Sequence, residues 1–397
     1  MKFTPKVDRV EYGGAQLGFA EIAAMFNVVM SQGGKRWTIG PESEAFEKEL
    51  AEVVGVKRAV VVNSGSSALL VGIAALKLPK GSHVIIPAVN FPTAFNAIIQ
   101  NGLVPHVVDV DVDSMNISLK EIEKAIAVDK QISAVLAVHV AGNPVDLTAI
   151  RAMIGDRDIK IISDNCDGLA STLDGVFIDA LADISCVSFH AAHIITTGEG
   201  GAVLTNDEKV ADTARKMREW GRASGTDKIY TYPGFPDDYR ERYVYEEIGY
   251  NMKPLELQCA LGGVQLKRLQ EFKDKRRYNH KRLEFIFSQF PQFQTTVSPE
   301  DSDPCWFSFA FLTSIPRKAV FEALEGNNIE CRTIFSGNIL LHPAYKDVEV
   351  VRAKEYPNAD RIMRDGVFIS VHPSITEDML LFEEQVLKEL CSKSSTG

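Results

Sequence analysis

The sequence predicts an α/β fold, in which a large domain with a mainly parallel β-sheet precedes a small C-terminal α+β domain. Short apolar runs alternate with helical stretches between residues 59 and 190, a pattern typical of parallel strands covered by helices on both faces. The chain of 397 residues also exceeds one ordinary hydrophobic core. We therefore expect a large domain over residues 1–265 and a small domain over residues 266–397.

The N-terminal half contains most of the expected sheet. Two helices are expected first, over 17–32 and 42–56, because apolar residues recur there with helical period. The alternating strand and helix segments follow at 59–76, 83–102, 105–111, 132–142, 160–168, 184–190 and 200–207. Residues 217–251 are rich in Gly, Pro, Tyr and charge, which indicates a long functional or partner-facing loop.

The C-terminal part begins with helical periodicity over 254–290, and we expect one long helix that crosses from the large domain to the small one. The segments 308–314, 320–335 and 377–390 then indicate the small α+β domain.

Composition excludes several classes of protein. The sequence is 45% hydrophobic and carries a net charge of -10 with acids and bases interspersed, which argues against a nucleic-acid-binding protein. No segment is long and apolar enough to cross a membrane, and the N-terminus lacks the apolar region of a signal peptide, so we expect a cytoplasmic protein. The six cysteines form no C-x-x-C pair, and neither a zinc site nor a disulfide framework is indicated.

Ligands of such sheets bind beyond the carboxyl ends of the strands, where the apolar runs stop. Polar residues gather at four of these ends, at 64–67, 90–93, 164–167 and 188–201. The string NSGSSALL follows a strand and opens a helix, so Gly65 and the neighbouring amides suit a phosphate. Ordinary helix capping explains the same string equally simply.

Three further side chains are candidates, each with a structural alternative. Asp164 ends a buried strand, where an ionised carboxylate needs a cation such as a protonated pyridine nitrogen; alternatively it caps the next helix. Asp167 lies three residues further on and can point into the same pocket. Of the histidines His190 and His193, either can act as a base or be structural, and Phe91 can stack on an aromatic ring or belong to the core.

Taken in order, these segments resemble the DegT/DnrJ/EryC1/StrS family of sugar aminotransferases, and more narrowly its nucleotide-sugar 3-dehydratase branch. The resemblance covers nearly the whole chain and is carried by NSGSSALL, NFPTAFNAIIQNGLVP, SDNCDGLAST, SFHAAHIITTGEGGAVLTN, IGYNMKPLELQCALG, DPCWFSFAF and PNADRIMRDG. It implies the aspartate-aminotransferase fold (PLP transferase type I) with pyridoxal 5'-phosphate (PLP) or pyridoxamine 5'-phosphate (PMP) as cofactor.

The resemblance also implies site residues by position. Phosphate, ring and ring-nitrogen contacts would come from Gly65, Ser66, Phe91, Asp164, Ser188 and Asn251. Asn251 would act on the neighbouring subunit, so a homodimer with a shared active site is implied. Arg332 sits where the family approaches its substrate, although a surface ion pair is an equal alternative for this guanidinium.

His193 falls where ordinary members of the family have the lysine that binds the cofactor covalently, and histidine there marks the dehydratase branch. The resemblance implies that PMP condenses with a 4-keto sugar and that His193 removes the C4' proton of the cofactor while hydroxide leaves sugar C-3. Asp167 is the second catalytic candidate. L-glutamate would supply the amino group that regenerates the cofactor.

The chain departs from the family pattern at several positions. CDP-sugar members use an iron–sulfur cluster, held by cysteines in the loop after WGR and by one near the ring-binding Asp. Cys166 is present at the latter place, but residues 221–250 contain no cysteine, so we expect no iron–sulfur cluster and no other metal. Ser163 stands where an acidic residue is common, and His190 stands where a tyrosine is common.

Three hypotheses follow for the function. The first is removal of the C-3 hydroxyl from a CDP- or GDP-linked 4-keto-6-deoxyhexose in deoxysugar biosynthesis. The second is a nucleotide-sugar aminotransferase adapted to histidine. The third is a regulator that binds cofactor or sugar nucleotide without chemistry.

Overall fold

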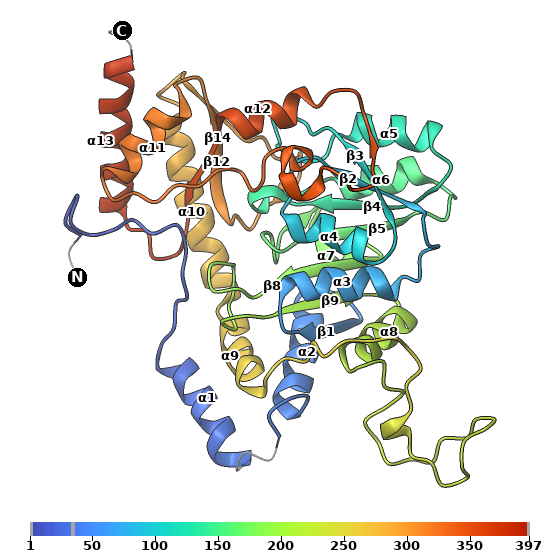
Figure 1. Ribbon diagram of the computed structural model, residues 1–397. Coiled ribbons are helices and arrows are strands. Elements are labelled where there is room, and N and C mark those ends of the chain that lie inside the picture. Colours follow the sequence, from blue (N-terminus) through green and yellow to red (C-terminus); the bar gives the residue numbers. More distant parts are fainter. Residues whose placement is uncertain (1–2, 33–35, 395–397) are drawn as a thin grey trace.

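The computed structural model describes residues 3–32 and 36–394 (Figure 1). Its largest sheet has eight strands in the order β1-β9-β8-β5-β4-β2-β3-β13. These strands are β1 (Arg58–Val62), β2 (His83–Pro87), β3 (Val104–Val108), β4 (Ile132–Val138), β5 (Lys160–Asp164), β8 (Ile184–Ser188), β9 (Gly201–Thr205) and β13 (Val351–Arg352). Only β9 runs in the direction opposite to the other strands of this sheet, so the predicted α/β fold with a mainly parallel sheet is confirmed.

Helices cover both faces of this sheet, because neighbouring apolar residues along each strand point to opposite faces. Val60 and Val62 belong to the core on one face, whereas Val61 belongs to the core on the other. The first face is covered by α3 (Gly65–Ala75), α4 (Pro92–Gln100) and α8 (Glu208–Arg218). The second face is covered by α2 (Pro41–Val53), α5 (Leu119–Val128), α6 (Leu147–Ile154), α7 (Ile178–Leu181) and α9 (Glu256–Lys267).

The predicted single long helix over 254–290 is wrong. Two helices occupy this segment, α9 and α10 (Leu269–Phe287), and they are separated at Arg268, whose φ of -98° and ψ of 1° are not helical. The guanidinium of Arg268 donates to the carbonyl of Gln16 and to Glu21. The break therefore coincides with a tertiary contact to the N-terminal segment, which no local pattern reveals.

The C-terminal elements surround a second, smaller sheet. Its antiparallel strands are β10 (Phe293–Thr295), β12 (Ser308–Thr313) and β14 (Gly366–Ser370). Helices α10, α11 (Arg317–Glu325) and α13 (Glu377–Ser394) contribute to its core, which also includes Val10 of the N-terminal segment. Conversely, β13 belongs to the C-terminal part of the sequence but pairs with β3 in the large sheet. The domain division at 265/266 stays a prediction.

The remaining elements are short or peripheral. They are α1 (Phe19–Gln32), β6 (Thr172–Leu173), β7 (Val176–Phe177), β11 (Ser302–Asp303), α12 (Pro357–Asp365) and the 3-10 turns η1 (Val140–Gly142), η2 (Glu241–Tyr243), η3 (Ile339–Leu341) and η4 (Pro343–Tyr345). Around η2, residues 219–250 form a long excursion that projects from the body after α8 (Figure 1). Within the described ranges, no helix has the length and apolar character required to span a membrane.

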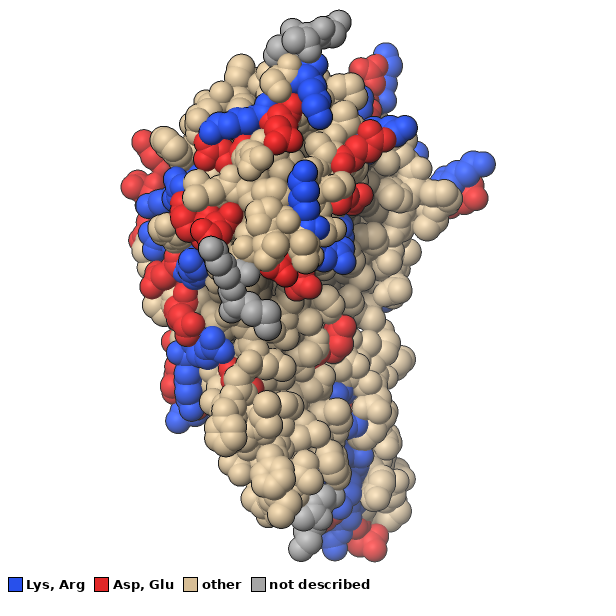
Figure 2. Space-filling model, turned by 90° about the vertical axis from the view of Figure 1, so that its left-hand side faces the viewer, with Lys and Arg blue, Asp and Glu red and all other residues tan. Residues whose placement is uncertain are grey.

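One face of the molecule carries few charges in its lower part. Figure 2 shows acidic and basic side chains mixed over the upper part of this face, whereas uncharged side chains dominate below. Helix α1 lies in this lower region in Figure 1 and exposes Phe19, Ile22, Phe26 and Met30. Such a cluster of exposed apolar side chains is typical of a surface that binds another protein.

Candidate active site

A cavity of about 660 Å³ opens beyond the carboxyl ends of the central strands, where the sequence places its polar residues. It collects all the predicted site residues except Asn251. Those in its lining are Gly65, Ser66, Phe91, Asp164, Asp167, Ser188, His193 and Arg332.

The N-terminus of α3 forms one wall of this cavity. Ser64 caps the helix and accepts a hydrogen bond from the backbone N–H of Ser67 (3.1 Å), so the capping interpretation of this string is correct. A Cβ atom at Gly65 would lie only 2.7 Å from Cβ of Ser188, which explains glycine at this position. Unpaired amides at a helix N-terminus attract anions, and the wall therefore also suits a phosphate group.

Asp164 ends β5 beneath the cavity and is 5% exposed. Its Oδ1 accepts a hydrogen bond from the backbone N–H of Cys166 (3.3 Å). Burial raises the pKa of Asp164, against the lowering effect of the hydrogen bonds from Cys166. A cation placed beside this carboxyl would favour its ionised form.

Asp167 and His193 form a second polar pair, with 4.0 Å between Oδ1 of Asp167 and Nε2 of His193. Oδ2 of Asp167 and Nδ1 of His193 are buried without a hydrogen-bond partner in the described structure. Burial, reinforced by the charge of Asp164, raises the pKa of Asp167 to about 8. Burial and the neighbouring His190 lower the pKa of His193 to about 3, so its imidazole is neutral and able to accept a proton.

The position of His193 is fixed from behind by Arg276 of α10. This buried guanidinium donates to the carbonyl of His193 (3.3 Å) and to the carbonyls of Trp306 (3.2 Å) and Phe307 (2.9 Å). The ring of Phe307 lies 5.3 Å from the ring of His193 in an edge-on arrangement. These contacts connect the loop that carries His193 to the C-terminal elements.

Asp167→Asn is expected to stabilise the unliganded protein in a pH-dependent manner. The pKa of Asp167 is raised to about 8 from 3.8, so the unfolded chain releases its proton first and stability falls as pH rises between these values. Asparagine removes this penalty, and the gain should grow to about 5 kcal/mol near pH 8. Thermal unfolding at pH 5 and pH 8 measures the difference; a gain that does not increase with pH would contradict this electrostatic account.

A chain of hydrogen bonds leads from the cavity wall to a buried carboxylate. The backbone N–H of Val145 donates to Nδ1 of His139 (2.9 Å), which places the imidazole proton on Nε2, 2.9 Å from Oγ of Ser163. Ser185 lies next, with its Oγ 3.2 Å from Ser163 and 2.6 Å from Oδ1 of Asp179. The resemblance leads us to expect an acidic residue at 163. The nearest carboxyl along this hydrogen-bond chain is that of Asp179, two hydroxyls from His139, and burial raises its pKa.

Aromatic and charged side chains surround the mouth. Phe91, at the start of α4, is 53% exposed, and its ring contacts that of Phe335 edge-on, so it is not an ordinary core residue. The guanidinium of Arg332 lies 4.7 Å from the centre of the Tyr12 ring and forms an ion pair with Glu330 (3.2 Å). Arg332 therefore forms the expected ion pair and also lines the cavity, and its contact with substrate stays a prediction.

Several lining residues come from segments that the sequence analysis did not select. They are Tyr12, His139, Phe307, Thr333, Phe335, Ser336, His342 and Phe368. Most belong to the N-terminal segment or to C-terminal elements that reach the cavity only through the tertiary fold. The sequence indicated only Thr333 and Phe335 among them, because these two residues lie next to Arg332 in the chain.

Asn251 does not join this cavity. It is exposed near the root of the long excursion, where its Oδ1 accepts a hydrogen bond from the ammonium group of Lys253 (2.7 Å). Within a single chain, Asn251 has no contact with the other predicted site residues in the described structure. Its role on a neighbouring subunit stays a prediction.

No lysine is found among the described residues that line the cavity. The nitrogen bases there are His139, His190, His193 and His342. His139 is committed to two hydrogen bonds, and His342 holds the carbonyl of Ser336 through its Nε2 (2.7 Å). His190 is half-exposed and lies 3.8 Å from Glu199, which leaves His193 as the enclosed imidazole, with its Nδ1 free of a hydrogen-bond partner in the described structure.

Comparison with known proteins gives a consistent result. Residues 20–385 match the model of the DegT/DnrJ/EryC1/StrS aminotransferase family. The chain is 35% identical over 382 residues to dTDP-4-dehydro-2,6-dideoxy-D-glucose 3-dehydratase of Saccharopolyspora spinosa, covering 91% of this chain and 82% of that protein. It is 31% identical over 372 residues to GDP-4-keto-6-deoxy-D-mannose 3-dehydratase of Escherichia coli O55:H7, covering 89% and 94%. A solved structure of the E. coli GDP-4-keto-6-deoxy-D-mannose-3-dehydratase with bound hydrated PLP superimposes with a TM-score of 0.86 at 30% identity, over 96% of this chain and 100% of that one.

Proposed function

Because the chain belongs to the DegT/DnrJ/EryC1/StrS aminotransferase family, we propose that it is a PLP/PMP-dependent enzyme that acts on nucleotide sugars. More narrowly, we propose that it removes the C-3 hydroxyl of a nucleotide-linked 4-keto-6-deoxyhexose in deoxysugar biosynthesis. The similar proteins named above include 3-dehydratases of dTDP- and GDP-linked sugars. The nucleotide of the substrate is accordingly CDP, GDP or dTDP in this proposal.

The observation that carries the narrower proposal is His193. An aminotransferase of this family needs a lysine that binds the cofactor covalently, whereas the described lining of this cavity contains none. Imidazole cannot replace the lysine amine in that covalent role, but it can accept and donate a proton. A cofactor that is held without a covalent bond, next to a neutral imidazole, favours dehydration over amino transfer.

The cavity fits a phosphorylated pyridine cofactor. The helix N-terminus with Gly65, Ser66 and Ser188 would hold the phosphate, and Phe91 would lie against the ring. Asp164 is a buried carboxyl with no cationic partner among the described ion pairs, and a protonated ring nitrogen would supply one. When bound, the cofactor provides an electron-withdrawing ring that stabilises negative charge on the atom attached to it.

The acid–base work is assigned to His193 and Asp167. The neutral ring of His193 accepts a proton. The positive charge that results lowers the pKa of Asp167, whose Oδ1 lies 4.0 Å from Nε2, and the ionised carboxylate would then stabilise the imidazolium. Arg276 holds the main chain of His193, and Phe307 limits the movement of its ring. The leaving hydroxide of the sugar needs a proton, and the imidazolium of His193 is the acid we assign to it.

The electron route and the amino donor are also part of the proposal. Cys166 lines the cavity, whereas the other five cysteines are buried and do not line it, and we retain the prediction that no iron–sulfur cluster is used. The product would then be a 3-deoxy-4-keto sugar formed by elimination and hydrolysis. L-glutamate would restore the amino form of the cofactor.

We further propose a homodimer with active sites shared between subunits. Helix α1 exposes a row of apolar side chains, and Asn251 lies outside the cavity of its own chain. A second copy that covers α1 would account for both features. Sedimentation equilibrium should give twice the mass of the chain, and replacing both Phe19 and Phe26 by Ser should weaken the dimer. A wild-type protein that sediments as a monomer at micromolar concentration would exclude the shared site.

The function is tested by mass spectrometry of the products. The protein, PMP and L-glutamate are incubated with CDP-, GDP- or dTDP-linked 4-keto-6-deoxyhexose, with no reductase present. The expected product has the mass of a 3-deoxy-4-keto sugar, and the substrate that yields it identifies the nucleotide. An amino-sugar product would assign an aminotransferase, and a protein that binds PMP yet converts none of these sugars would support a regulator.

A further inference from the structure

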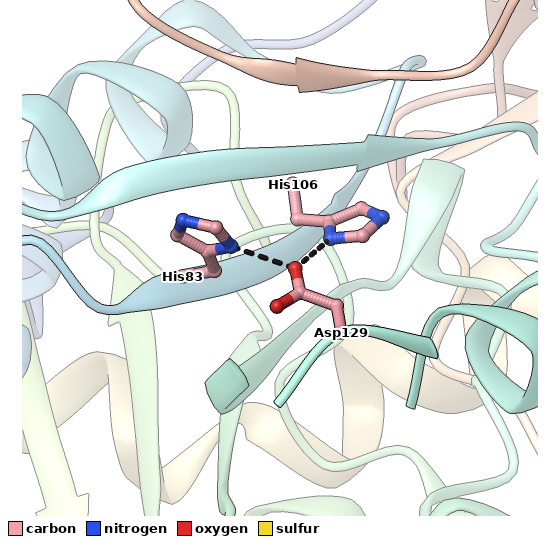
Figure 3. Close-up of side chains that lie close together, drawn as sticks. All are labelled: His83, His106 and Asp129. Atoms are coloured by element: carbon pink, nitrogen blue, oxygen red, sulfur yellow. Dashed lines mark hydrogen bonds and ion pairs between the residues drawn. The ribbon is translucent and has the colours of Figure 1, made fainter. Parts of the chain in front are cut away.

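Three metal-ligating side chains meet on the large sheet, outside the cavity (Figure 3). Nδ1 of His83 lies 2.6 Å from Oδ2 of Asp129, and Nδ1 of His106 lies 2.7 Å from the same oxygen. All the ligand atoms of the group lie within 4.8 Å of one another. In the ranges 3–32 and 36–394, no other group of three His, Cys, Asp or Glu side chains is this close.

Sheet register brings the two histidines together. In the parallel pair of β2 and β3, Ile85 pairs with His106, and His83 lies two residues before Ile85 on the same face of β2. The two imidazoles are therefore diagonal neighbours on one face. Asp129 directly follows α5, the helix that packs on this face, and its Oδ1 accepts from the backbone N–H of Gln131 (2.9 Å).

The cluster is separate from the active site. His83 is the first residue of β2, whereas the cavity lies beyond the last residue of that strand. The side chains of His83, His106 and Asp129 are 11–12% exposed, so they are shielded but still reached by solvent. None of them lines the cavity, and the proposed reaction gives them no role.

The cluster offers donor atoms of the kinds that bind transition-metal ions. Both imidazoles direct the same atom, Nδ1, toward Oδ2 of Asp129. Two imidazole nitrogens and a carboxylate oxygen are the ligands of many three-residue zinc sites, in which water occupies the fourth position.

We propose that His83, His106 and Asp129 bind one divalent transition-metal ion, and that Zn²⁺ is the ion whose chemistry they fit. Bonds of about 2.0–2.1 Å in tetrahedral geometry require ligand atoms about 3.3 Å apart. The nitrogen–oxygen distances from His83 and His106 to Asp129 are 2.6 and 2.7 Å, and small side-chain rotations at this partly exposed site would lengthen them to that value. The bound ion would link β2, β3 and the end of α5, and it would take no part in the reaction proposed above. This proposal differs from the sequence-based expectation that the protein binds no metal.

The test compares zinc binding by the full chain and by two variants after dialysis against EDTA. His83→Asn/His106→Asn keeps an N–H donor near each Nδ1 position and so retains the hydrogen bonds to Asp129. Asp156→Asn is the matched control, because Asp156 is an exposed carboxylate outside the cluster. Calorimetry with ZnCl₂ should show that each wild-type chain binds one ion. The double variant should bind zinc about 100-fold or more weakly, and the control should bind it with wild-type affinity.

Two further measurements keep the proposal testable if the double variant folds poorly. Zinc should raise the melting temperature of the wild-type protein, since an ion that binds only the folded state stabilises it. Co²⁺ should give the visible absorption of a tetrahedral site without thiolate charge-transfer bands. Absence of heat and of a melting shift would overturn the proposal, as would a thiolate band or an unchanged affinity in the double variant.

Discussion

His193→Asn is expected to lower the rate of C-3 dehydration by about 10²–10⁴-fold, the usual contribution of a positioned acid–base group. Asparagine has a similar size and leaves the main chain of the loop intact, so the carbonyl that Arg276 holds is retained. The amide, however, cannot accept a proton at neutral pH. Initial rates of deoxy-keto sugar formation, measured by mass at saturating PMP, give the size of the loss.

The control for this variant is the affinity for the cofactor. Absorbance titration with PLP should give nearly the wild-type dissociation constant, because the phosphate wall and Asp164 are unchanged. His190→Asn removes the other imidazole near the mouth and should cost far less, since His190 is half-exposed and lies next to Glu199. Full turnover by His193→Asn would remove histidine from the role of base.

Much of the site was predictable from where the strands end. Ser64 follows β1, Asp164 ends β5 and Ser188 ends β8, and each was selected because an apolar run stops there. The carboxyl ends of parallel strands share one edge of the sheet, so residues far apart in sequence converge in one cavity. This geometric rule needs only the identification of the strands.

Other parts of the site have no local signal. Tyr12 reaches the cavity because the N-terminal segment packs with the C-terminal core, as Val10 shows by pairing with Ile329. His83, His106 and Asp129 are separated by more than twenty residues at each step, and only the register of β2 and β3 brings the histidines together. The break at Arg268 likewise depends on a contact with the distant Glu21.

The resemblance assigned roles that a single chain cannot complete. Asn251 was implied to serve the partner subunit, and it is exposed and outside the cavity of its own chain. The substitution at Ser163 was recognisable in the sequence, but its surroundings were not. Ser185, which links Ser163 to Asp179 by hydrogen bonds, lies on a different strand, so the pairing of β5 with β8 was needed to see the connection.

Asp164→Asn is expected to have the second large effect, and its sign should differ between the unliganded and liganded protein. Without a cation, burial raises the pKa of Asp164, so the carboxyl lowers stability as pH rises above its unfolded value of 3.8. The amide carries no such penalty, and the unliganded variant should unfold at the same or a higher temperature at pH 8.

With cofactor, the same substitution removes one partner of a buried ion pair with the ring nitrogen. Loss of such a partner costs about 3–5 kcal/mol, which corresponds to a PLP affinity lower by roughly 10²–10⁴-fold. PLP titration and thermal unfolding of one preparation measure both effects. If the unliganded variant melts below the wild type, Asp164 is a structural hydrogen-bonding residue. If the variant is as stable as the wild type without cofactor but binds PLP more weakly, the carboxyl of Asp164 serves the cofactor. Its burial then lowers the stability of the empty protein, and the ring nitrogen of the cofactor supplies the cation that it pairs with.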